Sequence, residues 1–358
     1  MYRLSCLIVA LAMSKMLLAQ LVPVPGSQPV KLLFEAADVV CSGRVESLHV
    51  LEGKGVETGN GALLLKRVVA SVYVQDTYRA NETLPSSILV SFDEEAAGVS
   101  IAMPTLQQDE FAILFLKHSE DSSYVFADPY MGVTRFASIP GQEGGSGLLK
   151  LESTLAEIVR ENGRPDKIAA MQLLHGMEKL QPATLREITP QSVSRDPELA
   201  FGALAIMIKA GAPGSIETLE EQLQGYQGNG ALWALADLDG DLNQSSNRED
   251  LPALESLTSS KFMTVRLGSM EAIHNIGNLT SAPTLIRRLC DRLCDSDSTI
   301  RYLAVISLAE IFHKTGDYKP SMAEFSMSPL FYANQWRVWC AHDAAAFEEP
   351  ASTQRRTP

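Results

Sequence analysis

A repeat near the C-terminal end constrains this chain more than any other feature of its sequence. Residues 264–276 align without a gap with residues 299–311, and Arg301 follows Arg266 by 35 positions. Repeats of this length fold as units that bury their apolar faces only by stacking on one another. Apolar residues in the first copy recur at helical spacing, at Val265, Met270, Ile273 and Ile276. The sequence therefore predicts stacked helices.

A second helix is expected between the two copies, over residues 282–289, because Pro283 stands where a helix tolerates proline. It is followed by Leu293, a turn containing Asp295 and Asp297, and then Ile300 and Arg301. This order of leucine, aspartate-rich turn, β-branched residue and arginine resembles HEAT repeats.

In the HEAT family, the turn aspartate and the helix arginine form a hydrogen-bonded ladder between successive repeats. The resemblance implies that Asp295 or Asp297 binds Arg301, and that Arg266 belongs to a neighbouring repeat. A structural role is expected for all four residues.

Weaker copies are predicted upstream from period alone, over residues 198–207 with 216–223 and 231–238 with 251–257. An opening hairpin is expected over residues 151–161 and 165–180. Beyond Pro320 an aromatic helix is expected to cap the last repeat, which otherwise exposes an apolar face. Its residues are Phe325, Leu330, Phe331, Tyr332, Trp336, Val338 and Trp339.

The N-terminal half carries short β-branched runs ended by turn residues, which predict strands. The runs are residues 39–50, 64–77, 87–92, 111–117 and 123–127. In the second run Val68, Ala70, Val72 and Val74 share one face by the two-residue period. A small antiparallel barrel or sandwich is expected.

Residues 36–45, with the sequence AADVVCSGRV, and residues 110–116, with the sequence EFAILFL, resemble two strands of netrin-like, metalloproteinase-inhibitor-type oligonucleotide-binding (OB) barrels. The resemblance covers about a third of the chain. It implies an OB-like fold but no inhibitory activity, because the inhibitors' N-terminal cysteine and disulfide network have no counterpart here.

The chain as a whole is interpreted as an α+β multidomain protein, with an OB-like barrel followed by an α-solenoid of HEAT-type hairpins. Residues 1–20 resemble a signal peptide cleaved near Ala19-Gln20, so we expect a secreted or periplasmic protein without stable membrane insertion after cleavage. The further boundaries are 21–140 for the barrel, 141–150 for a Gly-rich linker, 151–345 for the solenoid and 346–358 for a disordered tail.

A net charge of -13 argues against a nucleic-acid partner, because this charge repels phosphate backbones. Motifs for phosphate binding, nucleophilic serine catalysis and zinc proteases are missing from the sequence, and its six histidines lack ligand spacing. We therefore expect a protein that is not an enzyme and has no cofactor.

Two patterns left metal binding open. Cys290 and Cys294 are one helical turn apart, which suits a metal or redox pair, although packing against the adjacent helix is the better explanation. Residues 237–243 alternate Asp237, Asp239, Asp241 and Asn243 like a calcium loop, but Gly240 stands at the wrong loop position, which favours an ordinary acidic loop.

The expected function is a scaffold that binds a protein or peptide on the concave surface of the repeats, with the barrel as a second contact module. The alternative is a ligand- or glycan-binding barrel face that uses Tyr73, Tyr78 and Phe92. A hydrolase with an atypical site is the third possibility, and it requires acidic residues and a histidine in one cleft.

Overall fold

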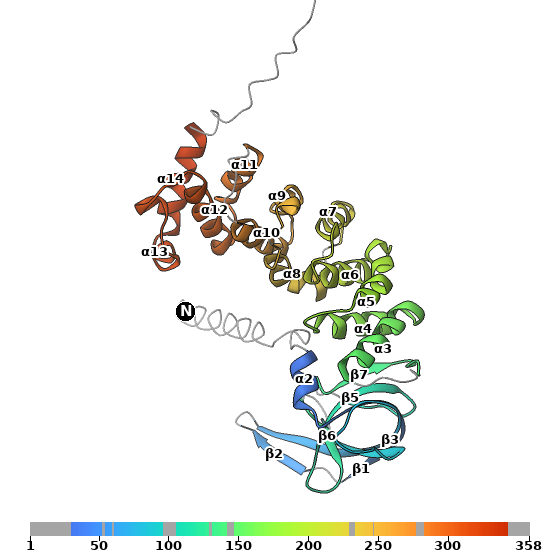
Figure 1. Cartoon of the computed structure of the whole chain (residues 1–358). Coiled ribbons are helices and arrows are strands. Elements are labelled where there is room, and N and C mark those ends of the chain that lie inside the picture. The colour runs from blue at the N-terminus through green and yellow to red at the C-terminus, as the bar shows by residue number, and fades with distance from the viewer. Residues whose placement is uncertain are drawn as a thin grey trace, which may run out of the picture. The chain divides into compact units, whose positions relative to one another are not determined.

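The computed structural model describes residues 30–51, 54–58, 61–95, 105–128, 131–141, 147–228, 233–245, 247–276 and 283–342. The predicted signal peptide, tail and central linker glycines Gly144 and Gly145 lie outside these residues. The chain divides into two compact units, Met1–Glu187 and Ile188–Pro358. Figure 1 shows all the described strands in the first unit, and helices in both.

The first unit is built around a closed β-barrel. Its strands are β1 (Val39–Val50), β2 (Lys54–Thr58), β3 (Gly61–Arg79), β4 (Ser87–Glu95), β5 (Phe111–His118), β6 (Tyr124–Phe126) and β7 (Val133–Phe136). The strands follow the order β1-β3-β4-β6-β5, and β1 also pairs with β5, which closes the barrel. Outside this ring, β2 pairs with β3 and β7 pairs with β5. Five strands thus complete a ring without an open edge.

This OB-like barrel confirms the predicted fold class, with one difference in strand direction. The β4–β6 pairing is parallel, while the other pairings of the ring are antiparallel. The predicted antiparallel arrangement was therefore wrong for the β4–β6 pair. This pairing is short, with two residue pairs, and residue periodicity does not report strand direction.

The alternation predicted for β3 is confirmed by burial. Val68, Ala70 and Val72 are buried in the barrel core, whereas Arg67 and Tyr73 are exposed. At the β1–β3 seam a Cβ on Gly43 would meet the carbonyl oxygen of Tyr73 at 2.5 Å. Glycine is needed here because the two backbones approach closely where the register shifts.

The first unit also contains α2 (Val30–Ala36), α3 (Gly147–Glu161), α4 (Arg164–His175) and most of α5 (Pro182–Ile188). Helix α3 is joined to β3 by the buried Lys150–Asp76 ion pair, with Nζ and Oδ1 2.6 Å apart. The buried hydroxyls of Tyr78 and Thr154 lie 3.4 Å apart beside it. These contacts group α3 with the barrel.

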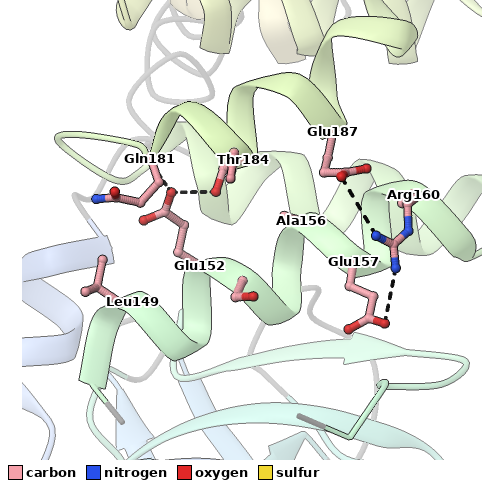
Figure 2. Close-up of a pocket in the computed structure, with 10 residues that line it drawn as sticks. Leu149, Glu152, Ala156, Glu157, Arg160, Gln181, Thr184 and Glu187 are labelled. Carbon is pink, nitrogen blue, oxygen red and sulfur yellow. Dashed lines mark hydrogen bonds and ion pairs between the residues drawn. The ribbon is translucent and has the colours of Figure 1, made fainter. Parts of the chain in front are cut away.

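From the sequence, we expect a Gly-rich linker over residues 141–150 and place the helices that follow it in the solenoid. The structure instead divides the chain after Glu187, and α3 begins at Gly147, inside the predicted linker. Helix α3 also contacts α5: Oε1 of Glu152 accepts hydrogen bonds from Gln181 N and Thr184 Oγ1 (Figure 2). The helical period predicts that these segments are helices, but it does not report that α3 packs with the barrel unit.

The second unit is a stack of helices. Its α-helices are α6 (Pro197–Lys209), α7 (Ser215–Gly225), α8 (Trp233–Asn243), α9 (Leu251–Leu257), α10 (Met263–Ile276), α11 (Pro283–Arg292), α12 (Ser298–Ile311), α13 (Met322–Met327) and α14 (Pro329–His342). Short 3-10 turns are η1 (Thr189–Val193), η2 (Arg248–Asp250) and η3 (Gly316–Tyr318).

Two rows of helices form this stack. Helices α6, α8, α10 and α12 contact one another in sequence, and α7, α9 and α11 form the second row (Figure 1). A Cβ on Gly268 of α10 would meet the Cα of Asp239 at 2.6 Å, so glycine permits the close approach of α8 and α10. One cluster of buried apolar side chains extends from Phe201 to Trp336. The predicted continuous spine is therefore present.

Two helices, α13 and α14, form the C-terminal end where one capping helix was expected. Phe325 and Trp336 are buried, and the Trp339 and Phe312 ring centroids lie 4.2 Å apart. Leu330 and Phe331 are exposed on the other side of α14. Within the parts of the chain that the structure describes, every helix is too short or too polar to cross a lipid bilayer.

Candidate functional site: a groove between repeat helices

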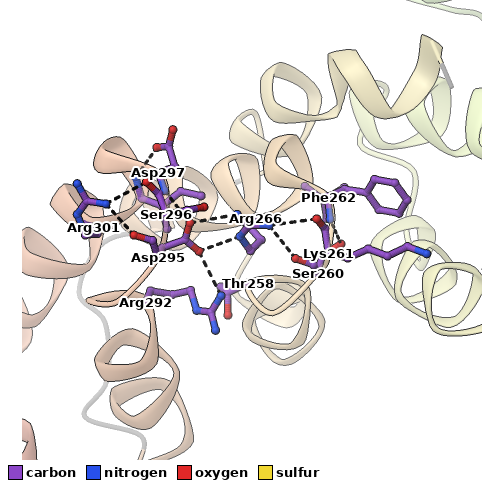
Figure 3. A network of polar contacts seen from close by, with 12 residues as sticks. Thr258, Ser260, Lys261, Phe262, Arg266, Arg292, Asp295, Ser296, Asp297 and Arg301 are labelled. Carbon is purple, nitrogen blue, oxygen red and sulfur yellow. Dashed lines mark hydrogen bonds and ion pairs between the residues drawn. The ribbon is translucent and has the colours of Figure 1, made fainter. Parts of the chain in front are cut away.

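The four residues singled out as a repeat ladder meet in one network at the ends of α10, α11 and α12 (Figure 3). Arg266 donates from Nε to Asp295 Oδ2 at 2.8 Å and from Nη2 to Asp295 Oδ1 at 3.1 Å. Both side chains are largely buried, with 11% and 3% of their surface exposed. This is the planar two-point geometry in which an arginine holds a carboxylate most firmly.

Arg301 does bind Asp295, as expected, but through the backbone carbonyl oxygen and not through the carboxylate. Its Nη1 donates to the carbonyl oxygens of Asp295 and Ser296, and Arg266 Nη1 does the same to those of Ser260 and Lys261. The two sets of contacts differ by one 35-residue period. Each arginine thus closes the turn before its own helix.

Asp297 has a separate role as the N-cap of α12. Its Oδ1 accepts from the backbone N–H groups of Thr299 and Ile300, which lack partners inside the helix. The two aspartates of the turn therefore have different roles. Asp295 joins two repeats, and Asp297 caps the N-terminus of the next helix.

Asp295 is kept ionised by these neighbours. Burial raises its pKa, but the Arg266 hydrogen bonds, the N–H of Asp297 and the positive charges of Arg266 and Arg292 together hold the pKa below the usual 3.8. The carboxylate thus serves as a fixed structural anion.

The ladder ends at Arg301. The position that corresponds to Asp295 in the next repeat would be residue 330, and it is a leucine. Within the described residues, Nε of Arg301 has no hydrogen-bond partner, whereas Nε of Arg266 binds Asp295. These residues therefore hold successive repeats together.

A pocket of about 360 Å³ lies between α7 and α9, in the second row of helices. Tyr226 and Phe262 form its aromatic wall, with stacked rings whose centroids are 5.9 Å apart. Lys261 Nζ lies 5.2 Å from each ring centroid and donates to the carbonyl oxygen of Tyr226. The remaining lining is mostly polar: Glu220, Leu223, Gln224, Gln227, Ser256, Leu257, Ser259 and Ser260.

Charge changes sign along this second row. Helix α7 contains Glu217, Glu220 and Glu221 and no basic residue. Helix α11 contains Arg287, Arg288 and Arg292 against the single carboxylate of Asp291. The exposed Arg287 and Arg288 make α11 the basic side of the row, whereas α7, which lines the aromatic pocket through Glu220, carries only acidic charges.

Neither pattern considered for metal binding forms a metal site. Cys290 forms a disulfide with Cys340, while Cys294 is a free, exposed thiol, so packing alone was the wrong explanation for Cys290. Residues 237–243 lie inside α8, Trp233–Asn243, so the expected acidic loop was also wrong. Among the described residues, no three His, Cys, Asp or Glu side chains are gathered as metal ligands.

The aromatic platform suggested for the barrel is not on its surface. Tyr78 and Phe92 are buried, at 1% and 7% exposed, and of the three residues only Tyr73 reaches solvent. Alternation within β3 separates Tyr73 from Tyr78, because odd and even positions of a strand face opposite sides. The platform prediction was wrong.

Sequence reasoning missed Tyr226, Lys261 and Phe262. A helix end and an inter-helix turn carry them, 35 or more positions apart, so no local period links them. The chain matches no family model, and its comparison with curated proteins gives no significant match.

Proposed function

We propose that this protein is a non-catalytic scaffold that binds a protein or peptide partner along α7, α9 and α11, and that its helices are HEAT-type repeats. The surface of these helices offers a long contact area without a deep catalytic pocket, which suits recognition of extended partners.

The observation that carries the proposal is the aromatic pocket between α7 and α9, in a row whose charge changes from acidic α7 to basic α11. Partly buried aromatic rings backed by a cation are the kind of feature that dominates binding energy at interfaces. The charges of α7 and α11 add orientation, since complementary charge steers association and fixes register. The expected partner has an apolar or aromatic anchor for the pocket, basic residues near α7 and acidic residues near α11.

Export to an oxidising compartment is part of the proposal. The Cys290–Cys340 disulfide supports it, since such bonds persist outside the reducing cytosol. The signal-like residues 1–20 support it from the sequence.

Charge reversal on the full-length chain tests the binding surface. Partner capture from the native secreted or periplasmic fraction is compared between the wild type and the double variant Arg287→Glu/Arg288→Glu. The matched control is Lys66→Glu/Lys117→Glu, which changes the charge equally at exposed barrel positions. Captured proteins are quantified by mass spectrometry at two salt concentrations.

The proposal expects one protein to be enriched by the wild type and by the barrel control, and reduced at least tenfold by the α11 variant. Higher salt should weaken that capture. Equal capture by the α11 variant, or loss only in the barrel control, would move the binding surface away from the second row of helices.

A further inference from the structure

A second pocket, of about 530 Å³, lies entirely in the first unit, between α3 and α5. Leu149, Ala156 and Ala183 supply apolar surface to it, and Ser153 is exposed at its edge. Its charged lining residues are Glu152, Glu157, Glu187 and Arg160 (Figure 2). This pocket is separate from the α7–α9 pocket proposed for a macromolecular partner.

Glu152 is the unusual residue of this pocket, because a glutamate is rarely so buried without a counter-ion. Only 2% of the residue is exposed, yet both hydrogen bonds that it receives go to Oε1, from Gln181 N and Thr184 Oγ1, each at 2.6 Å. Among the described residues, no group donates to Oε2. Figure 2 shows this second oxygen directed toward the space between Gln181 and Leu149.

The one cation in the lining does not neutralise Glu152. Arg160 is paired with Glu157 at 3.4 Å, Glu161 at 2.8 Å and Glu187 at 3.8 Å. The pocket is therefore negatively charged, and its most buried carboxylate has an acceptor oxygen left over. Glu152 Oε2 is not among the polar atoms that the protein seals from solvent without a partner, so this oxygen is open to the pocket and can accept a hydrogen bond from a bound cation.

We propose that this pocket binds a primary alkylammonium group, with the ammonium on Glu152 Oε2 and the alkyl chain against Leu149, Ala156 and Ala183. An ammonium is a compact charge that one oxygen can accept. A guanidinium prefers two carboxylate oxygens, and Oε1 already has two donors. Such a group is supplied either by a lysine side chain or by a free diamine.

Calorimetric titration of the full-length chain tests the site. The probes are N-acetyl-lysine methylamide and cadaverine, which separate the two sources of the ammonium group. N-acetyl-norleucine methylamide removes the charge, and N-acetyl-arginine methylamide replaces the ammonium by a guanidinium. The variants are Glu152→Gln, which keeps an oxygen for Gln181 and Thr184, and Ser153→Trp, which fills the pocket mouth. Glu82→Gln is the matched control, at an exposed glutamate of the barrel unit.

The proposal predicts saturable binding of at least one ammonium probe to the wild type and to Glu82→Gln. Affinity should fall at least tenfold in both pocket variants, and the norleucine and arginine probes should bind at least tenfold more weakly. If Glu152→Gln melts earlier than the wild type by circular dichroism, Ser153→Trp alone decides. The proposal is overturned if neither ammonium probe saturates, if the pocket variants bind as the wild type does, or if the norleucine or arginine probe binds equally well.

Discussion

Among single residues, Asp295 has the most demanding environment in the repeat stack. Its side chain is 3% exposed and is balanced by Arg266 and Arg292, which contact it from α10 and from the end of α11. A buried ion pair adds little net stability when intact, but removing one partner leaves the other charge without compensation. A single substitution in this pair should therefore lower the free energy of unfolding strongly.

We predict that Asp295→Asn lowers the free energy of unfolding by about 3 kcal/mol at pH 7. Because the folded-state pKa of Asp295 lies below 3.8, its contribution is complete above that pH and declines as the pH falls towards the lower folded-state pKa. Denaturant unfolding at pH 7 and at pH 3 measures the difference. Asp109→Asn, at an exposed pair with Arg44, is the control and should change little. An equal loss at both pH values would contradict the assignment.

The two free cysteines in the part of the chain that the structure describes, Cys41 and Cys294, should differ sharply in reactivity. Burial in the barrel raises the pKa of the Cys41 thiol to about 12, so the reactive thiolate is scarce. Cys294 is exposed, with its Sγ 2.9 Å from Arg337 Nη2. Iodoacetamide at pH 8 should label Cys294 in the native protein and Cys41 only after unfolding, as read by peptide mass spectrometry. Native labelling of Cys41 would show that the barrel core is open.

Residue roles could be predicted only where they are local. The N-cap role of Asp297 follows from the residues around it, although sequence analysis assigned it to the ladder. The partner of Asp295 could not be derived in the same way, because Arg266 lies 29 positions earlier and reaches it only through stacking of two repeats. The Cys290–Cys340 bond, with a separation of 50, depends on the same stacking.

Among the elements, α3 was predicted as a helix but assigned to the wrong unit. The Lys150–Asp76 pair is about one-tenth exposed on each side and ties α3 to β3. Apolar periodicity reports that a segment is a helix, but not which neighbour it packs against. This is why the boundary between the units could not be placed from sequence.

Substitution of Lys150 tests this attachment. Lys150→Met keeps an unbranched apolar side chain and removes one half of the buried Lys150–Asp76 ion pair, so we expect the unfolding free energy to fall by about 3 kcal/mol. The comparison is Lys31→Met, at an exposed pair with Glu178, which should cost less than about 1 kcal/mol. Chemical denaturation followed by circular dichroism gives both values. A loss no larger than that of the comparison would mean that α3 is held by apolar packing alone.

At the other end of the chain, the disulfide ties α14 to α11. It closes a loop of 50 residues, and a cross-link of that length stabilises by about 4 kcal/mol in the chain-entropy model. Reduction with dithiothreitol should therefore lower the thermal midpoint of the wild type. Cys340→Ser should begin from a lower midpoint and show no further change on reduction. A wild type that is insensitive to reduction would contradict a stabilising bond.

Several strands and helices were predicted with bounds close to those of the structure, among them β1 (Val39–Val50) and α9 (Leu251–Leu257), whereas some short elements were missed. The bounds of β1 were predicted as the structure has them, Val39–Val50, from a β-branched run that turn residues end. The four-residue β7 and the helix α5, Pro182–Ile188, were not predicted. The α3–α5 pocket could not be foreseen for this reason, because α5 provides one wall.

At the scale of the whole molecule, the two units carry different proposed roles. The barrel unit contains the acidic pocket around Glu152, while the helical unit presents the row with the Tyr226–Phe262 groove. Net negative charge disfavours nucleic acid, but the arginines of α11 give this acidic chain a local basic surface. A partner that binds by charge would therefore be recognised by the arginines of α11 and not by the net charge of the chain.

Hydrogen–deuterium exchange of the full-length chain, with and without its captured partner, tests the scaffold proposal most directly. The proposal predicts slower exchange on binding in α7, α9 and α11 and in the turn that contains Lys261 and Phe262, with the barrel strands unchanged. Protection confined to the barrel, or absent from all three helices, would contradict binding along the second row.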